Sequence, residues 1–93
     1  FNYSEASERY AHIAQAMSID LGGLSKIDIK QALLDHIREL RGSVGLKKKL
    51  EEIGVSPQDI SELARKALED TCMATNPIAP TLQEIEEVYH AAF

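Results

Sequence analysis

Apolar residues recur along this chain at the three- and four-residue spacing that places a stripe on one face of an α-helix. The first stripe predicts a helix from about Ser4 to Met17. A long central helix follows, beginning near Ser25 and ending within Gly42 to Gly45. No segment alternates in the period-2 manner of a β-strand. The stripe of the central helix consists of Ile29, Leu33, Ile37, Leu40 and Val44.

The middle of the chain predicts two further helices. A short third helix is expected over residues 46–53, closed by Gly54, a residue suited to the left-handed cap conformation. Ser56 is then placed as an N-cap and Pro57 as the first helical residue, where a missing N–H does no harm. This pair begins a fourth helix, which runs to about Asp70.

Residues 71–80 are predicted to form a loop, because two prolines remove backbone donors and push their predecessors toward extended geometry. Thr81 followed by Glu84 has the spacing of a capping box and begins a last helix that extends to the chain end. The sequence therefore predicts an all-α fold of about five helices. We expect residues 1–93 to form a single helical subdomain.

Composition excludes several classes of function. Apolar residues make up 44% and charged residues 27% of the chain, with no apolar run long enough to cross a membrane. A net charge of -5 argues against nucleic acid, since the basic run at residues 47–49 is followed at once by Glu51 and Glu52. One cysteine fits a reducing, cytoplasmic location. Phe1 stands where an initiator Met is expected, which indicates a fragment of a longer protein.

Residues with catalytic or metal-binding chemistry are few and scattered. His12, His36 and His90 fall on three different predicted helices, none in the spacing of a zinc-binding helix. We expect His12 and His90 to be solvated and His36 to border the core. Carboxylates sit mainly at helix starts, where capping explains them. The residues alone therefore predict no catalytic group, no metal ligand and no cofactor-binding residue.

Cys72 has the most suggestive setting, because it follows a helix within the irregular 71–80 segment. A free cysteine is most often a small buried hydrophobic residue. Binding residues, however, concentrate on loops that rigid elements hold in place. Both interpretations of Cys72 remain open on the residues alone.

Four separated blocks of this chain resemble the C-terminal end of the iron-containing (group III) alcohol dehydrogenases. They occur in the family's order and cover nearly all 93 residues. The blocks are Phe1-Asn2 with Arg9-Tyr10-Ala11-His12-Ile13-Ala14, Val44-Gly45-Leu46 with Leu50 and Ile53-Gly54-Val55, Ala67-Leu68-Glu69-Asp70-Thr71-Cys72 with Asn76-Pro77, and Thr81 with Glu84-Ile85, Val88-Tyr89 and Ala92.

This resemblance implies a parent enzyme of the dehydroquinate synthase-like fold, with an N-terminal dinucleotide-binding domain and a C-terminal helical domain. Such enzymes interconvert primary alcohols or diols and aldehydes, using NAD or NADP and a divalent metal, iron or zinc, that polarises the substrate oxygen. The family's metal ligands, one Asp and three His, all precede the position of Phe1. The fragment alone is then expected to lack cofactor and metal, and to be inactive.

One site residue is implied by the resemblance, because the residue matching Cys72 lies near the substrate side of the family's cleft. Cys72 is therefore expected to line the substrate pocket in a non-catalytic role. Ile78 departs from the family, many of whose members have arginine after Asn-Pro.

Two functional hypotheses follow. The first is a C-terminal subdomain of a metal-dependent alcohol dehydrogenase, whose partners are the missing N-terminal domain and a small alcohol or aldehyde. The alternative is a free-standing helical module that binds a partner protein. Under the first hypothesis, helix faces that packed on the absent part are left exposed, so the isolated fragment is expected to self-associate.

Overall fold

The computed structural model describes residues 1–93 and divides them into two compact units, Phe1–Lys47 and Lys48–Phe93. Four α-helices and three short 3₁₀-helices make up the regular structure, and no residue lies in a β-strand, so the prediction of an all-helical fold is confirmed. No helix is both long enough and apolar enough to cross a membrane. The elements are α1 (Tyr3–Ala16), α2 (Lys26–Ser43), η1 (Glu51–Ile53), η2 (Pro57–Asp59), α3 (Ile60–Leu68), η3 (Thr71–Thr75) and α4 (Leu82–His90).

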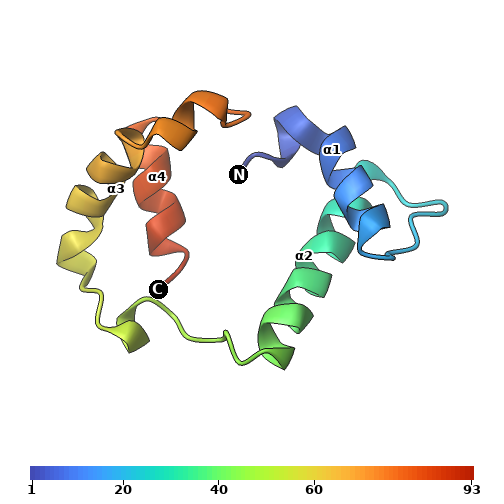
Figure 1. Ribbon diagram of the computed structural model, residues 1–93, viewed down its shortest axis with the longest axis horizontal. Coiled ribbons are helices and arrows are strands. Elements are labelled where there is room, and N and C mark those ends of the chain that lie inside the picture. Colours follow the sequence, from blue (N-terminus) through green and yellow to red (C-terminus); the bar gives the residue numbers. More distant parts are fainter. The chain divides into compact units, whose positions relative to one another are not determined.

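The first unit is built from α1 and α2, which lie side by side (Figure 1). Ala14 of α1 and Leu33 of α2 are buried. The Tyr3 hydroxyl donates a 2.6 Å hydrogen bond to the carbonyl oxygen of Lys26, and the Lys30 ammonium lies 5.8 Å from the centre of the Tyr3 ring. These contacts fasten the first turn of α1 to the first turns of α2.

Ser25 begins α2 as the sequence predicts. Its side chain accepts a hydrogen bond from the backbone N–H of Asp28, and the Asp28 carboxylate accepts one from the backbone N–H of Ser25. Because these bonds satisfy donors that the first turn leaves without intrahelical partners, the sequence fixes the start of α2 locally.

In the second unit, α3 and α4 lie side by side (Figure 1). Ile60 and Ala64 of α3 and Ile85 of α4 are the buried residues of this unit. The Ser61 hydroxyl also donates a 2.7 Å hydrogen bond to the Glu86 carboxylate, joining the two helices at the surface. The core is therefore small, and α3 and α4 hold the segment between them in place.

The predicted helix over residues 46–53 is wrong in extent, since only the single 3₁₀ turn of η1 forms there. Gly45 and Gly54 adopt positive φ angles of 78° and 89° and bound the segment on both sides. Leu46 and Ile53 are exposed, so the segment lacks the tertiary packing that stabilises a short α-helix. Within it, the Glu52 carboxylate accepts a hydrogen bond from the backbone N–H of Lys49. The α-helix count is accordingly four rather than about five.

Other predicted boundaries differ by smaller amounts. The helix predicted after Ser56 begins with the 3₁₀ turn of η2 before it continues as α3. Residues 71–80, predicted as a loop, include the 3₁₀ helix η3. The last helix ends at His90 rather than at the chain end. The predicted caps Ser56 and Thr81 and the left-handed Gly54 are confirmed.

Candidate functional site

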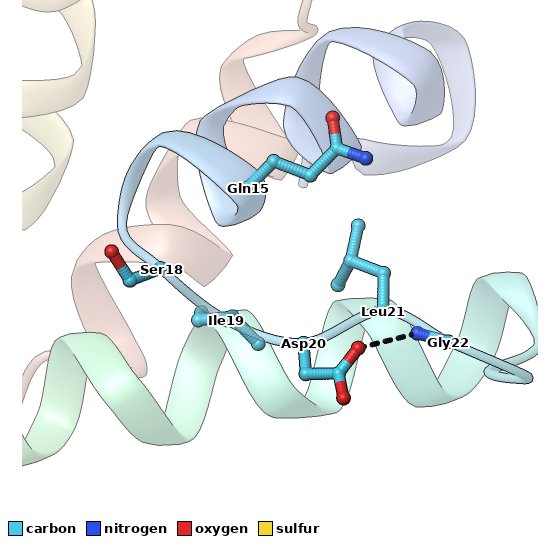
Figure 2. A pocket seen from close by; sticks show the side chains of 6 residues that line it. All are labelled: Gln15, Ser18, Ile19, Asp20, Leu21 and Gly22. Atoms are coloured by element: carbon cyan, nitrogen blue, oxygen red, sulfur yellow. Dashed lines mark hydrogen bonds between the residues drawn. The ribbon is translucent and has the colours of Figure 1, made fainter.

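The first unit contains an open hollow of about 540 Å³ that follows the C-terminal end of α1. Gln15 and residues 18–22, which are close together in the sequence, supply the lining. Figure 2 shows the Leu21 side chain pointing toward Gln15 and the Asp20 carboxylate bonded to the backbone of Gly22, at 2.9 Å. The hollow is thus the inner side of a turn. The Asp20 carboxylate in this turn already accepts a hydrogen bond from the backbone of the same turn.

A second open hollow, of about 410 Å³, lies in the second unit and contains Cys72. Three elements and the junction before η3 converge on it. Half-buried apolar or aromatic side chains form most of its lining, and polar groups stand at its exposed edge. The lining residues are Leu63, Lys66 and Ala67 from α3, Asp70 from the junction, Cys72 and Met73 from η3, and Tyr89 from α4. We call this the Cys72 hollow and take it as the candidate site.

Asp70 fixes the position of Cys72. As the N-cap of η3, Asp70 has an extended backbone, and its carboxylate accepts a 2.7 Å hydrogen bond from the backbone N–H of Cys72. The Thr75 hydroxyl donates a 3.1 Å hydrogen bond to the carbonyl oxygen of Cys72. The Cys72 backbone is therefore held on both sides, while its side chain remains exposed as a free thiol.

The same carboxylate also affects the pKa of the thiol. A hydrogen bond with Asp70, then the negative charge of Asp70, and then loss of solvent raise the pKa of Cys72 above its ordinary value. In return, hydrogen bonding from Cys72 lowers the pKa of Asp70. The thiol is consequently neutral and the carboxylate ionised at neutral pH. A neutral thiol is a poor nucleophile and a poor metal ligand, but it is a compact group that can line a pocket.

The one basic side chain that lines the hollow, Lys66, lies within an ion-pair network on α3. The Lys66 ammonium lies 3.4 Å from the Glu62 carboxylate, and Arg65 pairs with both Glu62 and Glu69 on the same helix. The hollow therefore offers an apolar wall with a neutral thiol, suited to the carbon atoms of a small molecule rather than to acid–base chemistry.

The histidines do not assemble into a site. His12 and His90 are exposed and His36 is half-buried, as the sequence predicts. No group of three or more His, Cys, Asp or Glu side chains is placed to hold a metal ion. These residues by themselves thus provide no such cluster for the divalent metal that the resemblance implies.

Ile78 lies in a bend that follows η3. The side-chain amide of Asn76 donates a hydrogen bond to the carbonyl oxygen of Ile78. Ile78 is half-buried, so an apolar side chain suits the position where the family resemblance leads one to expect arginine.

Of the residues that line the Cys72 hollow, the sequence singled out only Cys72. Leu63 and Tyr89 lie on apolar helix stripes, and that position alone does not show that both are half-buried at the hollow. Asp70 carried a usable signal, because a carboxylate two residues before Cys72 has the spacing of a cap onto its backbone N–H.

Comparison with known proteins gives one consistent result. The Fe-containing alcohol dehydrogenase family, C-terminal part, matches residues 1–93. Lactaldehyde reductase of Escherichia coli (strain K12) is 34% identical over 93 residues, which are 100% of this chain and 24% of the relative. NAD-dependent methanol dehydrogenase of Bacillus methanolicus is 32% identical over 88 residues, 95% of this chain and 23% of the relative.

The fold agrees with these sequence matches. A crystal structure of 1,3-propanediol oxidoreductase superposes with a TM-score of 0.93 at 30% identity, covering 99% of this chain and 24% of that one. The chain thus spans about a quarter of the length of the relatives it matches. A family match over the whole chain does not favour the alternative of a free-standing interaction module.

Proposed function

Because this chain belongs to the Fe-containing alcohol dehydrogenase family, we propose that it is the C-terminal helical part of a metal-dependent alcohol dehydrogenase that uses NAD or NADP. The proposed reaction interconverts small primary alcohols or diols and aldehydes. The observation that carries the proposal is the match of residues 1–93 to the family's C-terminal part. The names of the relatives support the substrate class, since they include lactaldehyde reductase, NAD-dependent methanol dehydrogenase and 1,3-propanediol dehydrogenase.

Residues 1–93 contribute support and a pocket wall in this proposal, rather than the reacting groups. The metal and the dinucleotide are bound by a preceding part of the same chain, which includes the N-terminal domain. The 93 residues alone are then inactive. They belong together as one helical subdomain of the longer enzyme. We place this enzyme in the cytoplasm, because Cys72, the one cysteine of these 93 residues, is an exposed free thiol.

Cys72 lines the substrate side of the pocket in a non-catalytic role. Its exposed side chain, its raised pKa and the apolar residues around it support this assignment. A neutral thiol contacts the carbon atoms of a small alcohol, takes no part in the hydride transfer and is a poor ligand for the metal.

The proposed activity is tested on the full-length chain loaded with iron or zinc. We expect small primary alcohols or diols to reduce NAD or NADP, followed by the absorbance of the reduced nicotinamide. The 93-residue chain under the same conditions gives no reduction. A folded, metal-loaded full-length protein that oxidises none of these alcohols with either dinucleotide would contradict the proposal.

The role of Cys72 is tested by changing the size of the side chain at this position. Cys72→Ser preserves the volume and should keep KM within about twofold, whereas Cys72→Phe should raise KM for the alcohol about tenfold or more by filling the hollow. Ala74→Phe is the matched control, since Ala74 lies in the same 3₁₀-helix but does not line the hollow. Equal KM values for Cys72→Phe and Ala74→Phe would contradict the assignment.

We also propose that the 93 residues self-associate when produced alone, since many large apolar side chains are exposed, among them Leu46 and Ile53. Sedimentation at increasing concentration measures this. A clean monomer at the highest concentration would count against the proposal.

A further inference from the structure

The apolar stripe of α2 is half-buried at Ile29, buried at Leu33 and exposed from Ile37 onward. Its members follow one another at helical spacing along a single face. Leu33 is 3% exposed, but the exposed fraction then rises to 38% at Ile37, 50% at Leu40 and 60% at Val44, the C-cap residue of α2. The apolar spacing of the stripe therefore continues beyond the part of α2 where its side chains are buried.

The reason is the placement of α1. Its hydrogen bond and ring contact reach Lys26 and Lys30, in the first turns of α2. Figure 1 shows α1 beside the N-terminal half of α2, with α2 continuing past it. The C-terminal half of α2 thus carries a ready-made apolar face that α1 does not cover.

The other face of α2 is polar and internally satisfied. Gln31 and Arg38 both donate hydrogen bonds to the Asp35 carboxylate, and all three side chains are exposed. The side of α2 that carries these three residues is thus suited to solvent and the opposite side to packing, while Ile27 and Leu34 are exposed apolar residues between the two.

We propose that Ile37, Leu40 and Val44, here called the α2 ridge, pack as interior residues against an apolar segment of the same polypeptide that precedes residue 1. The inference rests on the proposed function, because that preceding segment belongs to the proposed enzyme. Its support is the length of the relatives, of which this chain spans 24%, so most of such an enzyme lies outside these residues.

Size and chemistry favour this occupant over a second copy of the chain. A stable interface between separate proteins involves about 20–30 residues on each side, so the three ridge residues are too few to form one by themselves. Its members are all aliphatic and present no polar group to give specificity to a transient partner. A short, wholly aliphatic surface fits packing within one chain, where covalent connection removes the need for a large interface.

Site-specific photo-cross-linking of the full-length protein identifies the occupant. With p-benzoylphenylalanine in place of Leu40 or Val44, we expect cross-linked species of monomer mass whose peptides map to residues before Phe1. The matched control carries the same group in place of Glu39, an exposed neighbour on another face, and should give no such cross-link. Dimer-mass products, peptides only from within the 93 residues, or yields equal to the Glu39 control would each overturn the proposal.

Thiol accessibility keeps the test valid if the bulky probe prevents folding. In a full-length chain whose native cysteines are replaced by serine, Leu40→Cys should react with a thiol reagent about 100-fold more slowly than Glu39→Cys. Equal rates would overturn the proposal. Alcohol oxidation is measured separately on the unmodified full-length protein, so a protected ridge in a chain without that activity would refute the proposed function and leave this contact standing.

Discussion

The Asp70 carboxylate accepts a hydrogen bond from the backbone N–H of Cys72 and also raises the pKa of the Cys72 thiol. One side chain thus does two things: it caps the 3₁₀-helix η3 and raises the pKa of the neighbouring thiol. The position of Cys72 and its chemical state are coupled through Asp70. The two effects of Asp70 can be separated experimentally, because asparagine at position 70 preserves the cap but removes the charge.

Asp70→Asn is expected to shift the pH profile of Cys72 labelling to lower pH. Removing the negative charge removes a cause that raises the thiol pKa, so the thiolate forms at lower pH, while asparagine remains a good cap. The measurement is the rate of reaction with a thiol reagent against pH. Glu69→Gln is the control, since Glu69 is adjacent but pairs with Arg65 and does not contribute to the Cys72 shift. A profile unchanged in Asp70→Asn would contradict the coupling.

Local chemistry explains what could be predicted from the sequence. The caps Ser25 and Thr81 were predictable because each bonds to a partner three residues away, so no tertiary contact decides the outcome. The helix over residues 46–53 could not be assigned correctly, because side-chain pattern alone does not separate an α-helix from a single 3₁₀ turn.

The candidate site was predictable only in part. Cys72 stood out by its place after a helix, and Asp70 was within reach of the same local reasoning. Tyr89 joins the hollow through the packing of α4 on α3, a long-range arrangement that periodicity does not specify. A half-buried stripe residue and a core residue follow the same sequence pattern, so the hollow could be identified only from the structure.

Ser18→Gly is expected to stabilise the chain by up to about 1 kcal/mol. Ser18 has a positive φ of 62°, a conformation that costs energy for a residue with a Cβ atom. The converse control is Gly54→Ala, which should destabilise by about 1 kcal/mol, because Gly54 has a φ of 89°. A Cβ atom at Gly54 would meet no atom within 4 Å, so backbone strain alone is measured. Denaturant titration gives both values, and a loss of stability in Ser18→Gly would refute the account.

Thr81→Val is expected to lower the free energy of unfolding by about 1 kcal/mol. The Thr81 hydroxyl oxygen accepts a hydrogen bond from the backbone N–H of Glu84, which has no partner within the first turn of α4. Valine keeps the shape and removes the acceptor. Thr81→Ser restores the hydroxyl and should recover most of the stability, so a serine variant as unstable as the valine variant would point to lost packing instead of a lost cap.

The Glu84 carboxylate is expected to make the stability of α4 depend on pH in the acid range. Hydrogen bonds from the backbone N–H of Thr81, and then from its hydroxyl, lower the pKa of Glu84. A carboxyl whose pKa is lowered by folding stabilises the native state fully above its unfolded pKa, about 4.3 for glutamate. That contribution is lost as the pH falls through the lowered native value.

Glu84→Gln should therefore be less stable than the unaltered chain at neutral pH, and the difference should disappear at the acid end of the titration. Denaturant unfolding of both proteins at a series of pH values measures it. In a Thr81→Val background the neutral-pH difference should shrink, because the hydroxyl donor is gone, yet persist, because the Thr81 backbone N–H still donates to Glu84. A difference that stays constant down to the lowest pH would show that shape, not ionisation, makes Glu84 useful at the start of α4.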